Sequence, residues 1–286
     1  METEMIRKVA QAARVALGVC LLLVAGCQSP ARTTSPATGG AGTTAGQAAT
    51  LGSATQNQNS LVGAWRLVRS TDPGRQVANS VKIVAENSYT FADYDLNQKR
   101  FIGAGGGTFT VSEGRYTETI EYDTRDSNRV GSYLAYGFNL AGNTLRLTTQ
   151  QGGRQVEETW ERVDAGDSPL AGAWRIRERE TQPGQMSVMQ RGPRKTIKWL
   201  SGTRFQWAAI NTQTKQFFGT GGGTYTLQDG KYTEHIEFFS RDNSRVGASL
   251  SFDYEVKNGD WHHRGKSSTG NPIYEVWALE RDWSGQ

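Results

Sequence analysis

Short runs of alternating hydrophobic and polar residues, separated by turn signals, make up most of the chain from residue 60 onward. From Tyr116 to Tyr122, Tyr, Glu, Ile and Tyr occupy every second position, with Thr, Thr and Glu between them. A two-residue period is typical of a strand with one buried face. Seven turn signals, such as Ser112-Glu-Gly and Ala141-Gly-Asn, separate eight such segments up to residue 153. Because no segment sustains a 3.6-residue period, the pattern predicts an all-β fold, an antiparallel up-and-down barrel of about eight strands.

The pattern occurs twice, in the same order. The motif LVGAWR at residues 61–66 returns as LAGAWR at 170–175, and three further stretches return: 101–110 at 217–226, 116–121 at 232–237, and 125–131 at 241–247. The second copy carries about seven additional residues near Gln182–Pro193. An ordered repeat of this kind predicts two homologous domains. We expect one barrel at residues 59–163 and another at 168–283.

The first 26 residues have the features of a targeting segment. Arg7, Lys8 and Arg14 precede the apolar run 15–25, which is shorter than the roughly 20 residues of a membrane-spanning helix but fits a secretory signal. The run ends in Leu23-Val24-Ala25-Gly26-Cys27 and resembles the lipobox of bacterial lipoproteins. The resemblance implies that residues 1–26 are removed and that Cys27 is lipidated. Gln28 at the next position then implies sorting to the outer membrane, whereas the alternative is a plain secretory signal with an incidental cysteine.

Residues 27–58 consist mainly of Thr, Ala, Gly, Ser and Gln, with few large apolar side chains. Such a segment does not bury enough surface to offset the entropy of ordering, so the composition predicts a disordered, flexible tether. The predicted protein is therefore a lipid-anchored envelope protein with the membrane as its partner and two barrels beyond the tether.

Composition limits the functional classes. Of 286 residues, 36% are hydrophobic and 21% charged, with a formal net charge of +4. That apolar content does not fit a polytopic membrane protein, and the mild basicity predicts no nucleic-acid partner. With three His and two Cys, and no Gly-x-Ser-x-Gly motif, we expect no catalytic residues, no metal site, no cofactor and no enzymatic activity. The oligomeric state stays open.

Several motifs resemble a known family. Gly63-Ala64-Trp65 and Gly172-Ala173-Trp174 are similar to the Gly-x-Trp opening of lipocalins. Together with the Gly-Gly-Gly-Thr stretches and the closing Glu-x-Trp motifs, they resemble bacterial lipocalin-like domains of unknown function. The resemblance implies that an arginine near the last strand covers the first-strand tryptophan. Arg162 is the candidate for Trp65, and Arg281 for Trp174.

The duplicated glycine runs, Gly105, Gly106 and Gly107 in one copy and Gly221, Gly222 and Gly223 in the other, are followed by β-forming residues. A phosphate loop requires a helix after the glycines, so this context does not fit one. Glycines inside a strand more often mark a bulge or a close backbone approach. A structural role is therefore expected, and a gate into the barrel is the alternative.

Glu118 and Glu234 share their alternation face with aromatic residues and isoleucine. If that face points inward, each carboxylate lies inside a barrel and needs a partner. Arginines of the following loop or tyrosine hydroxyls are the candidates. The functional hypothesis is an interior anchor for a polar ligand group; the alternatives are a structural ion pair, or Glu118 in solvent. The candidate binding residues are Tyr116, Glu118, Tyr122 and Arg129 in the first copy, and Tyr232, Glu234, Phe238 and Arg245 in the second.

His235, His262 and His263 occur only in the second copy, where they are packing or surface residues or form a divergent site. Its tryptophans, Trp261, Trp277 and Trp283, are core residues or, alternatively, a surface row of aromatics. We predict that one or both barrels bind a small apolar or amphipathic ligand. The alternative is a surface module with filled barrels that docks a protein or glycan. The interior volume of each barrel distinguishes the two.

Overall fold

The computed structural model describes residues 58–75 and 78–281. The predicted signal segment, Cys27 and the tether up to residue 57 lie outside the described residues. Within the described part, none of the helices has the length and apolar character needed to cross a membrane.

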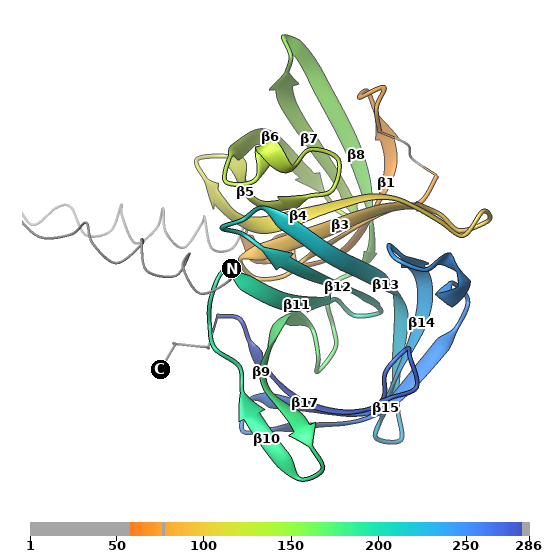
Figure 1. The fold of residues 1–286 in the computed structure, drawn as a ribbon. Helices are drawn as coiled ribbons and strands as arrows, with labels where there is room; N and C mark the ends of the chain where they lie inside the picture. Colours follow the sequence, from red (N-terminus) through yellow and green to blue (C-terminus); the bar gives the residue numbers. More distant parts are fainter. Residues whose placement is uncertain (1–57, 76–77, 282–286) are drawn as a thin grey trace, which may run out of the picture. The chain divides into compact units, whose positions relative to one another are not determined.

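The first domain is a closed barrel of eight antiparallel strands in sequence order (Figure 1). The last strand pairs with the first, so the sheet has no free edge. A short 3₁₀ helix, η1 (Ser127–Arg129), connects the fifth and sixth strands. The strands are β1 (Gly63–Ser70), β2 (Ser80–Val84), β3 (Ser88–Asp95), β4 (Arg100–Ser112), β5 (Arg115–Asp123), β6 (Tyr133–Ala141), β7 (Thr144–Gln151) and β8 (Arg154–Asp164).

The second domain repeats this barrel with one addition. Its first strand, β9, pairs with both β11 and β17, which closes a ring of eight strands. The additional residues form the β9–β10 hairpin, whose strand β10 pairs with β9. The elements are β9 (Gly172–Gln182), β10 (Gln185–Val188), β11 (Arg194–Leu200), β12 (Arg204–Asn211), β13 (Gln216–Gln228), β14 (Lys231–Phe239), η2 (Asn243–Arg245), β15 (Ser249–Lys257), β16 (Asp260–Lys266) and β17 (Pro272–Leu279). The predicted fold, two antiparallel eight-stranded barrels in tandem, is confirmed.

The opening tryptophan of each barrel is fully buried and has the same indole contact. Trp65 Nε1 donates to the carbonyl of Leu61 at 2.8 Å, and Trp174 Nε1 donates to that of Leu170 at 2.8 Å. The guanidinium of Arg162 lies 4.0 Å from the centroid of the Trp65 ring, which is the arrangement that the lipocalin resemblance implies. Arg281 forms an ion pair with Glu86, in the connection between β2 and β3 of the first barrel.

The glycine runs lie on β4 and β13, where the neighbouring backbone leaves no room for a side chain. A Cβ atom at Gly107 would stand 2.0 Å from the carbonyl oxygen of Thr119, and one at Gly223 would stand 2.0 Å from that of His235. Both positions coincide with a register shift against the next strand. The glycines therefore permit a β-bulge and the close strand approach that accompanies it.

The two barrels fall within one compact unit and share a buried cluster of side chains. Trp199 Nε1 donates to Ser88 Oγ at 3.0 Å, and Gln206 Nε2 donates to the Tyr122 hydroxyl at 3.2 Å. The rings of Tyr94 and Phe238 stack with their centroids 4.9 Å apart. Aromatic side chains, hydrogen bonds and ion pairs such as Lys195–Glu121 at 2.7 Å thus carry the packing between the domains.

Candidate functional site

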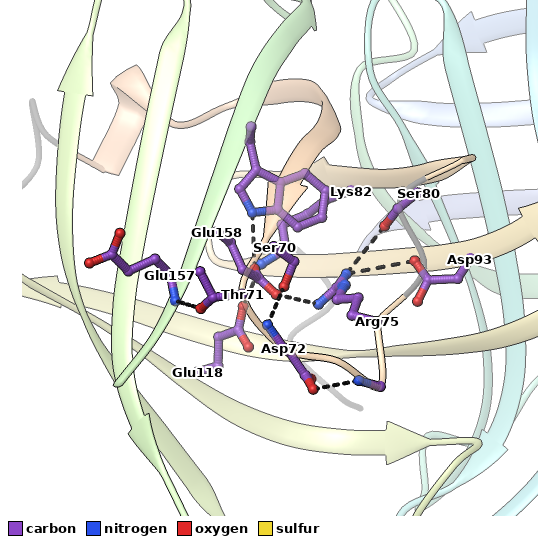
Figure 2. Close-up of polar contacts among 12 residues, drawn as sticks. Ser70, Thr71, Asp72, Arg75, Ser80, Lys82, Asp93, Glu118, Glu157 and Glu158 are labelled. Atoms are coloured by element: carbon purple, nitrogen blue, oxygen red, sulfur yellow. Dashed lines mark hydrogen bonds and ion pairs between the residues drawn. The ribbon is translucent and has the colours of Figure 1, made fainter. Parts of the chain in front are cut away.

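Each barrel contains a buried cluster of one lysine, one glutamate and one tyrosine. In the first barrel, Lys82 Nζ on β2 donates to Glu118 Oε1 on β5 at 2.8 Å (Figure 2). The Tyr116 hydroxyl donates to the same oxygen at 2.9 Å. The side chains of Lys82 and Glu118 are 3% and 5% exposed. The inward orientation of Glu118 satisfies the condition on which the anchor hypothesis depended.

The second barrel repeats the cluster. Lys198 Nζ donates to Glu234 Oε1 at 2.7 Å, and the Tyr232 hydroxyl donates to that oxygen at 2.9 Å. Burial, followed by the charge of Glu234, raises the pKa of Tyr232 well above its usual value, so the hydroxyl stays protonated and donates.

The candidate pairing of Arg129 with Glu118 and of Arg245 with Glu234 is wrong. Arg129 pairs with Asp123 at 2.8 Å, and Arg245 pairs with Asp242 at 3.1 Å. Both arginines belong to the 3₁₀ helix after the glutamate strand; Arg129 contacts the last residue of β5, and Arg245 contacts the residue before η2. The tyrosine alternative holds, but the lysines were missed. The available signal was a lysine at equivalent positions of both repeats, within the apolar segments Val81-Lys-Ile and Ile197-Lys-Trp.

The interior of the first barrel is filled by Arg75, from the connection between β1 and β2 (Figure 2). Its Nη1 donates to Glu158 Oε1 on β8 at 2.8 Å, and its Nη2 lies 3.7 Å from Asp93 Oδ1. The guanidinium carbon lies 4.7 Å from the centroid of the Phe91 ring and 5.1 Å from that of Trp160. The cavity that remains has a volume of about 60 Å³, enough for roughly two water molecules.

The second barrel is open at the corresponding place, with a cavity of about 290 Å³. At the 109-residue offset of the opening tryptophans, Arg75 corresponds to Gly184, which lies in the β9–β10 turn. Asp93 stands opposite Gly103, whereas its counterpart opposite Gly219 is Ala209. The second barrel therefore has no arginine at this position. The corresponding segment forms the β9–β10 hairpin, and an alanine takes the place of one of the two carboxylates that hold Arg75.

The cavity has apolar walls and a small set of polar groups. Its apolar lining comes from Ile176, Phe205, Trp207, Ile236, Phe239, Leu250, Phe252, Ile273 and Trp277, and its charged or titratable lining from Arg179, Lys198, Glu234, His263 and Glu275. A concave apolar pocket with a few placed polar groups is the usual form of a small-molecule site. Its volume is close to the threshold of about 300 Å³ that such sites reach.

His263 on β16 is the main change among the polar groups. It stands opposite Glu275, where Leu147 stands opposite Glu158 in the first barrel. The side chain is 3% exposed, and its Nδ1 lies 3.8 Å from Glu275 Oε2, too far for a hydrogen bond. Neither ring nitrogen has a hydrogen-bond partner among the described residues.

The charges of this pair follow from burial and from Arg179. Burial lowers the pKa of His263, so the imidazole is neutral near pH 7. Burial alone would raise the pKa of Glu275, but the contacts with His263 and Arg179 outweigh it and hold that pKa below its usual value. Arg179 Nη2 donates to Glu275 Oε1 at 2.7 Å.

Comparison with known proteins gives the family. Residues 60–168 and residues 169–279 each match the family described as "Domain of unknown function (DUF4488)". The chain belongs to the DUF4488 family. Two matches in tandem, each over one eight-stranded barrel, confirm the prediction of two tandem β-barrel domains of unknown function.

Two solved structures each match a part of this chain about as long as one DUF4488 domain. A lipocalin-like protein from Bacteroides uniformis ATCC 8492 is 11% identical, and the match covers 39% of this chain and 99% of that chain with a TM-score of 0.29. An uncharacterized protein from Bacteroides eggerthii DSM 20697 is 13% identical, with 38% and 98% covered and a TM-score of 0.27. No curated protein matches the chain.

The other residues singled out in the sequence have packing positions in the DUF4488 domains. Tyr122 donates to or accepts from Thr90 at 2.5 Å and lines the small cavity of the first domain. Phe238 packs in the cluster shared by the two domains. The alternative of a surface aromatic row is wrong for Trp261 and Trp277, which are buried in the second core, and Trp283 lies outside the described residues.

The remaining histidines are not at the cavity. His235 contacts Ser249 through Nδ1 at 2.8 Å, and His262 contacts the Tyr274 hydroxyl through Nδ1 at 2.9 Å. Among residues 58–75 and 78–281, no group of three or more His, Cys, Asp or Glu side chains is placed to hold a metal ion.

Proposed function

We propose that this protein is a non-enzymatic binding protein that holds one small amphipathic molecule in its second DUF4488 domain. The observation that carries the proposal is the cavity of about 290 Å³, with apolar walls and with Lys198, Glu234, His263 and Glu275 at its polar side. A dry cavity of about 150 Å³ is large enough for benzene. The observed volume therefore fits a molecule of on the order of 10–12 non-hydrogen atoms.

The contrast between the domains supports the assignment to the second one. The Lys–Glu–Tyr cluster occurs in both barrels, so it supports a structural role and does not by itself indicate a ligand. The pocket at the Lys–Glu pair differs in volume, about 60 Å³ in the first barrel, where Arg75 occupies it, and about 290 Å³ in the second. We therefore assign ligand binding to the cavity of the second barrel.

A filled first barrel supports the second candidate function for that domain, docking of a protein or glycan on its surface. Tyr133 on β6 is 74% exposed, and exposed aromatic side chains are frequent anchors of such contacts. Replacing Tyr133 by Ser should weaken capture of an envelope partner without changing small-molecule binding. If capture is unchanged, the surface role of Tyr133 is wrong.

We further propose that the chain is a lipoprotein held at the bacterial outer membrane through Cys27, on the support of the lipobox-like sequence. Several acyl chains give stable anchoring because each buried CH₂ contributes about 0.8 kcal/mol. A Cys27→Ser variant should move from the membrane fraction to the soluble envelope fraction. Continued retention of that variant in membranes would contradict the anchor.

Ligand binding is tested with naphthalene as a neutral apolar probe and tryptophan fluorescence as the readout. We expect saturable binding to the wild-type protein. Leu250, which is half-buried and lines the cavity, is the position to fill, and Leu134 is its counterpart in the first barrel. Leu250→Trp should weaken binding by about tenfold or more, while Leu134→Trp should leave it unchanged. Absence of saturable binding to the wild type, or equal loss in both variants, would overturn the proposal. Native mass spectrometry of protein purified from its own envelope would then identify the natural ligand.

A further inference from the structure

We propose that the molecule bound by the second barrel carries a cationic head, an ammonium or guanidinium group, on its apolar body, and that Glu275 selects this head. The proposal rests on the binding function proposed above and adds the chemistry of the ligand. It uses the first barrel as a template, because that barrel already contains a cationic group in its interior.

The first barrel shows which walls hold a guanidinium. Arg75 donates from Nη1 to the Glu158 carboxylate at 2.8 Å, and its guanidinium carbon lies 4.7 Å and 5.1 Å from the ring centroids of Phe91 and Trp160. Charge-assisted hydrogen bonds and cation–π contacts both favour a cation at this position. The Arg75 side chain therefore occupies a cation-binding position inside the first barrel.

The second barrel keeps the same three walls without a counterpart of Arg75, although Lys198 Nζ lies 5.3 Å from the Trp277 ring centroid and Arg179 bonds one oxygen of Glu275. Glu275 and Trp277 on β17 occupy the register positions of Glu158 and Trp160 on β8. Trp207 stands opposite Gly221 on the next strand, as Phe91 stands opposite Gly105. Glu275, Trp207 and Trp277 all line the 290 Å³ cavity. The repeat thus preserves a site for a cation and leaves it open to a separate molecule.

The carboxylates of the cavity retain acceptor capacity. Glu275 Oε1 accepts from Arg179 at 2.7 Å, and Glu234 Oε1 accepts from Lys198 at 2.7 Å. Among the described residues, no hydrogen bond reaches Oε2 of either carboxylate. In the first barrel, the equivalent Oε2 of Glu158 accepts from Trp160 Nε1 at 3.0 Å, whereas Trp277 Nε1 has no acceptor in the described part of the chain.

The existing cations do not fill this capacity. Lys198 and Arg179 are each bonded to a carboxylate, so neither is left as a binding group for an anion. His263, buried beside Glu275, adds no positive charge while it is neutral. A ligand head with several N–H donors therefore complements the two free carboxylate oxygens, and its charge is favoured by the aromatic walls.

The test compares three probes of nearly equal shape: 4-phenylbutylamine, 4-phenylbutan-1-ol and 4-phenylbutanoate. Isothermal titration of the purified full chain should show the amine binding about tenfold more tightly than the alcohol, with the acid weakest. If the alcohol binds as tightly as the amine, or the acid binds most tightly, cationic selection is overturned while ligand binding stands. If none of the three binds, the proposed function itself fails. These outcomes need no variant, so they do not depend on the folding of a mutant.

Variants then test the roles of Glu275 and of the template. Glu275→Gln should reduce the preference for the amine over the alcohol to within about threefold, whereas Glu161→Gln, an exposed change on β8, should leave it unchanged. Arg75→Ala should open the first barrel and raise the amine stoichiometry from one to two per chain. A preference that survives Glu275→Gln excludes Glu275 as the selecting residue, and a stoichiometry of one in the folded Arg75→Ala protein refutes the template.

Discussion

The buried Lys82–Glu118 pair offers the most direct test of the energetics of these barrels. Replacing Lys82 by Met leaves the carboxylate of Glu118 buried without its cationic partner, while the Tyr116 hydroxyl still donates to it at 2.9 Å. Removing one partner of a buried ion pair costs about 3–5 kcal/mol, because the other charge loses compensation without regaining water. For a domain of about 105 residues this corresponds to a fall in melting temperature on the order of 10–25 °C.

A double variant separates the energy of the ion pair from the energy of side-chain packing. Lys82→Met combined with Glu118→Leu removes both charges, and replacement of a buried pair by apolar residues is often neutral or stabilising. We expect the double variant to recover at least about 2 kcal/mol of the loss, with the acceptor lost by Tyr116 as the residual cost.

The assay is urea unfolding followed by tryptophan fluorescence and far-UV circular dichroism. Each barrel can give its own unfolding transition. The transition that Lys198→Met shifts belongs to the second barrel, and the one that Lys82→Met shifts belongs to the first. Arg66→Met is the matched surface control: Arg66 pairs with Glu161 at 2.8 Å but is 60% exposed, so its loss should cost less than about 1 kcal/mol. The reasoning is refuted if Lys82→Met costs no more than Arg66→Met, or if the double variant is as unstable as the single one.

Three further predictions follow from local geometry. Gly107→Ala should abolish folding of the first barrel by circular dichroism, because its Cβ would meet a carbonyl oxygen at 2.0 Å, whereas Gly192→Ala, in open space, should fold normally. Stability should fall as the pH drops below about 6.5, since the unfolded chain binds a proton at His263 while burial keeps the folded imidazole neutral; the urea midpoint measured at pH 7.5 and 5.5 should change less in His263→Leu. Arg162→Ala should cost roughly 1–3 kcal/mol in urea unfolding, because it removes the cover of Trp65 and a 2.7 Å hydrogen bond to the carbonyl of Val62.

Each of these outcomes has a clear opposite. A folded Gly107→Ala barrel would show that the bulge tolerates a side chain. An unchanged pH dependence in His263→Leu would assign the acid sensitivity to other groups around the cavity, of which Glu275, Glu234 and Lys198 are the nearest charges. An Arg162→Ala protein as stable as the wild type would exclude the cation–π cover as a stabilising contact.

Local signals carried most of the fold. Alternation over β5 and turn signals such as Ser112-Glu-Gly predicted strands and hairpins correctly, because side-chain direction and turn geometry depend on neighbouring residues. The internal repeat then doubled the barrel, and the seven additional residues became the β9–β10 hairpin. The same two-residue period placed Glu118 on one face with Tyr116, and the structure shows that this face points inward and that the Tyr116 hydroxyl donates to Glu118.

The site depended on contacts between distant residues. Lys82 and Glu118 are 36 positions apart and meet across the barrel interior, so no local pattern pairs them, and Arg129, the nearer candidate, pairs with Asp123 instead. The register of β16 against β17 sets His263 opposite Glu275, and a count of residues from the first copy does not give that register.

By itself, the sequence determined two homologous eight-stranded barrels and the strand face that each glutamate shares with its aromatic neighbours, since both follow from repetition and periodicity. Only the tertiary structure decided which barrel is full. That outcome depends on where the Arg75 side chain and the inserted hairpin lie in space, and on whether their volume occupies the interior or leaves about 290 Å³ free. Cavity volume is a sum over packed atoms from every strand of the barrel, and it is therefore a property of the folded structure alone.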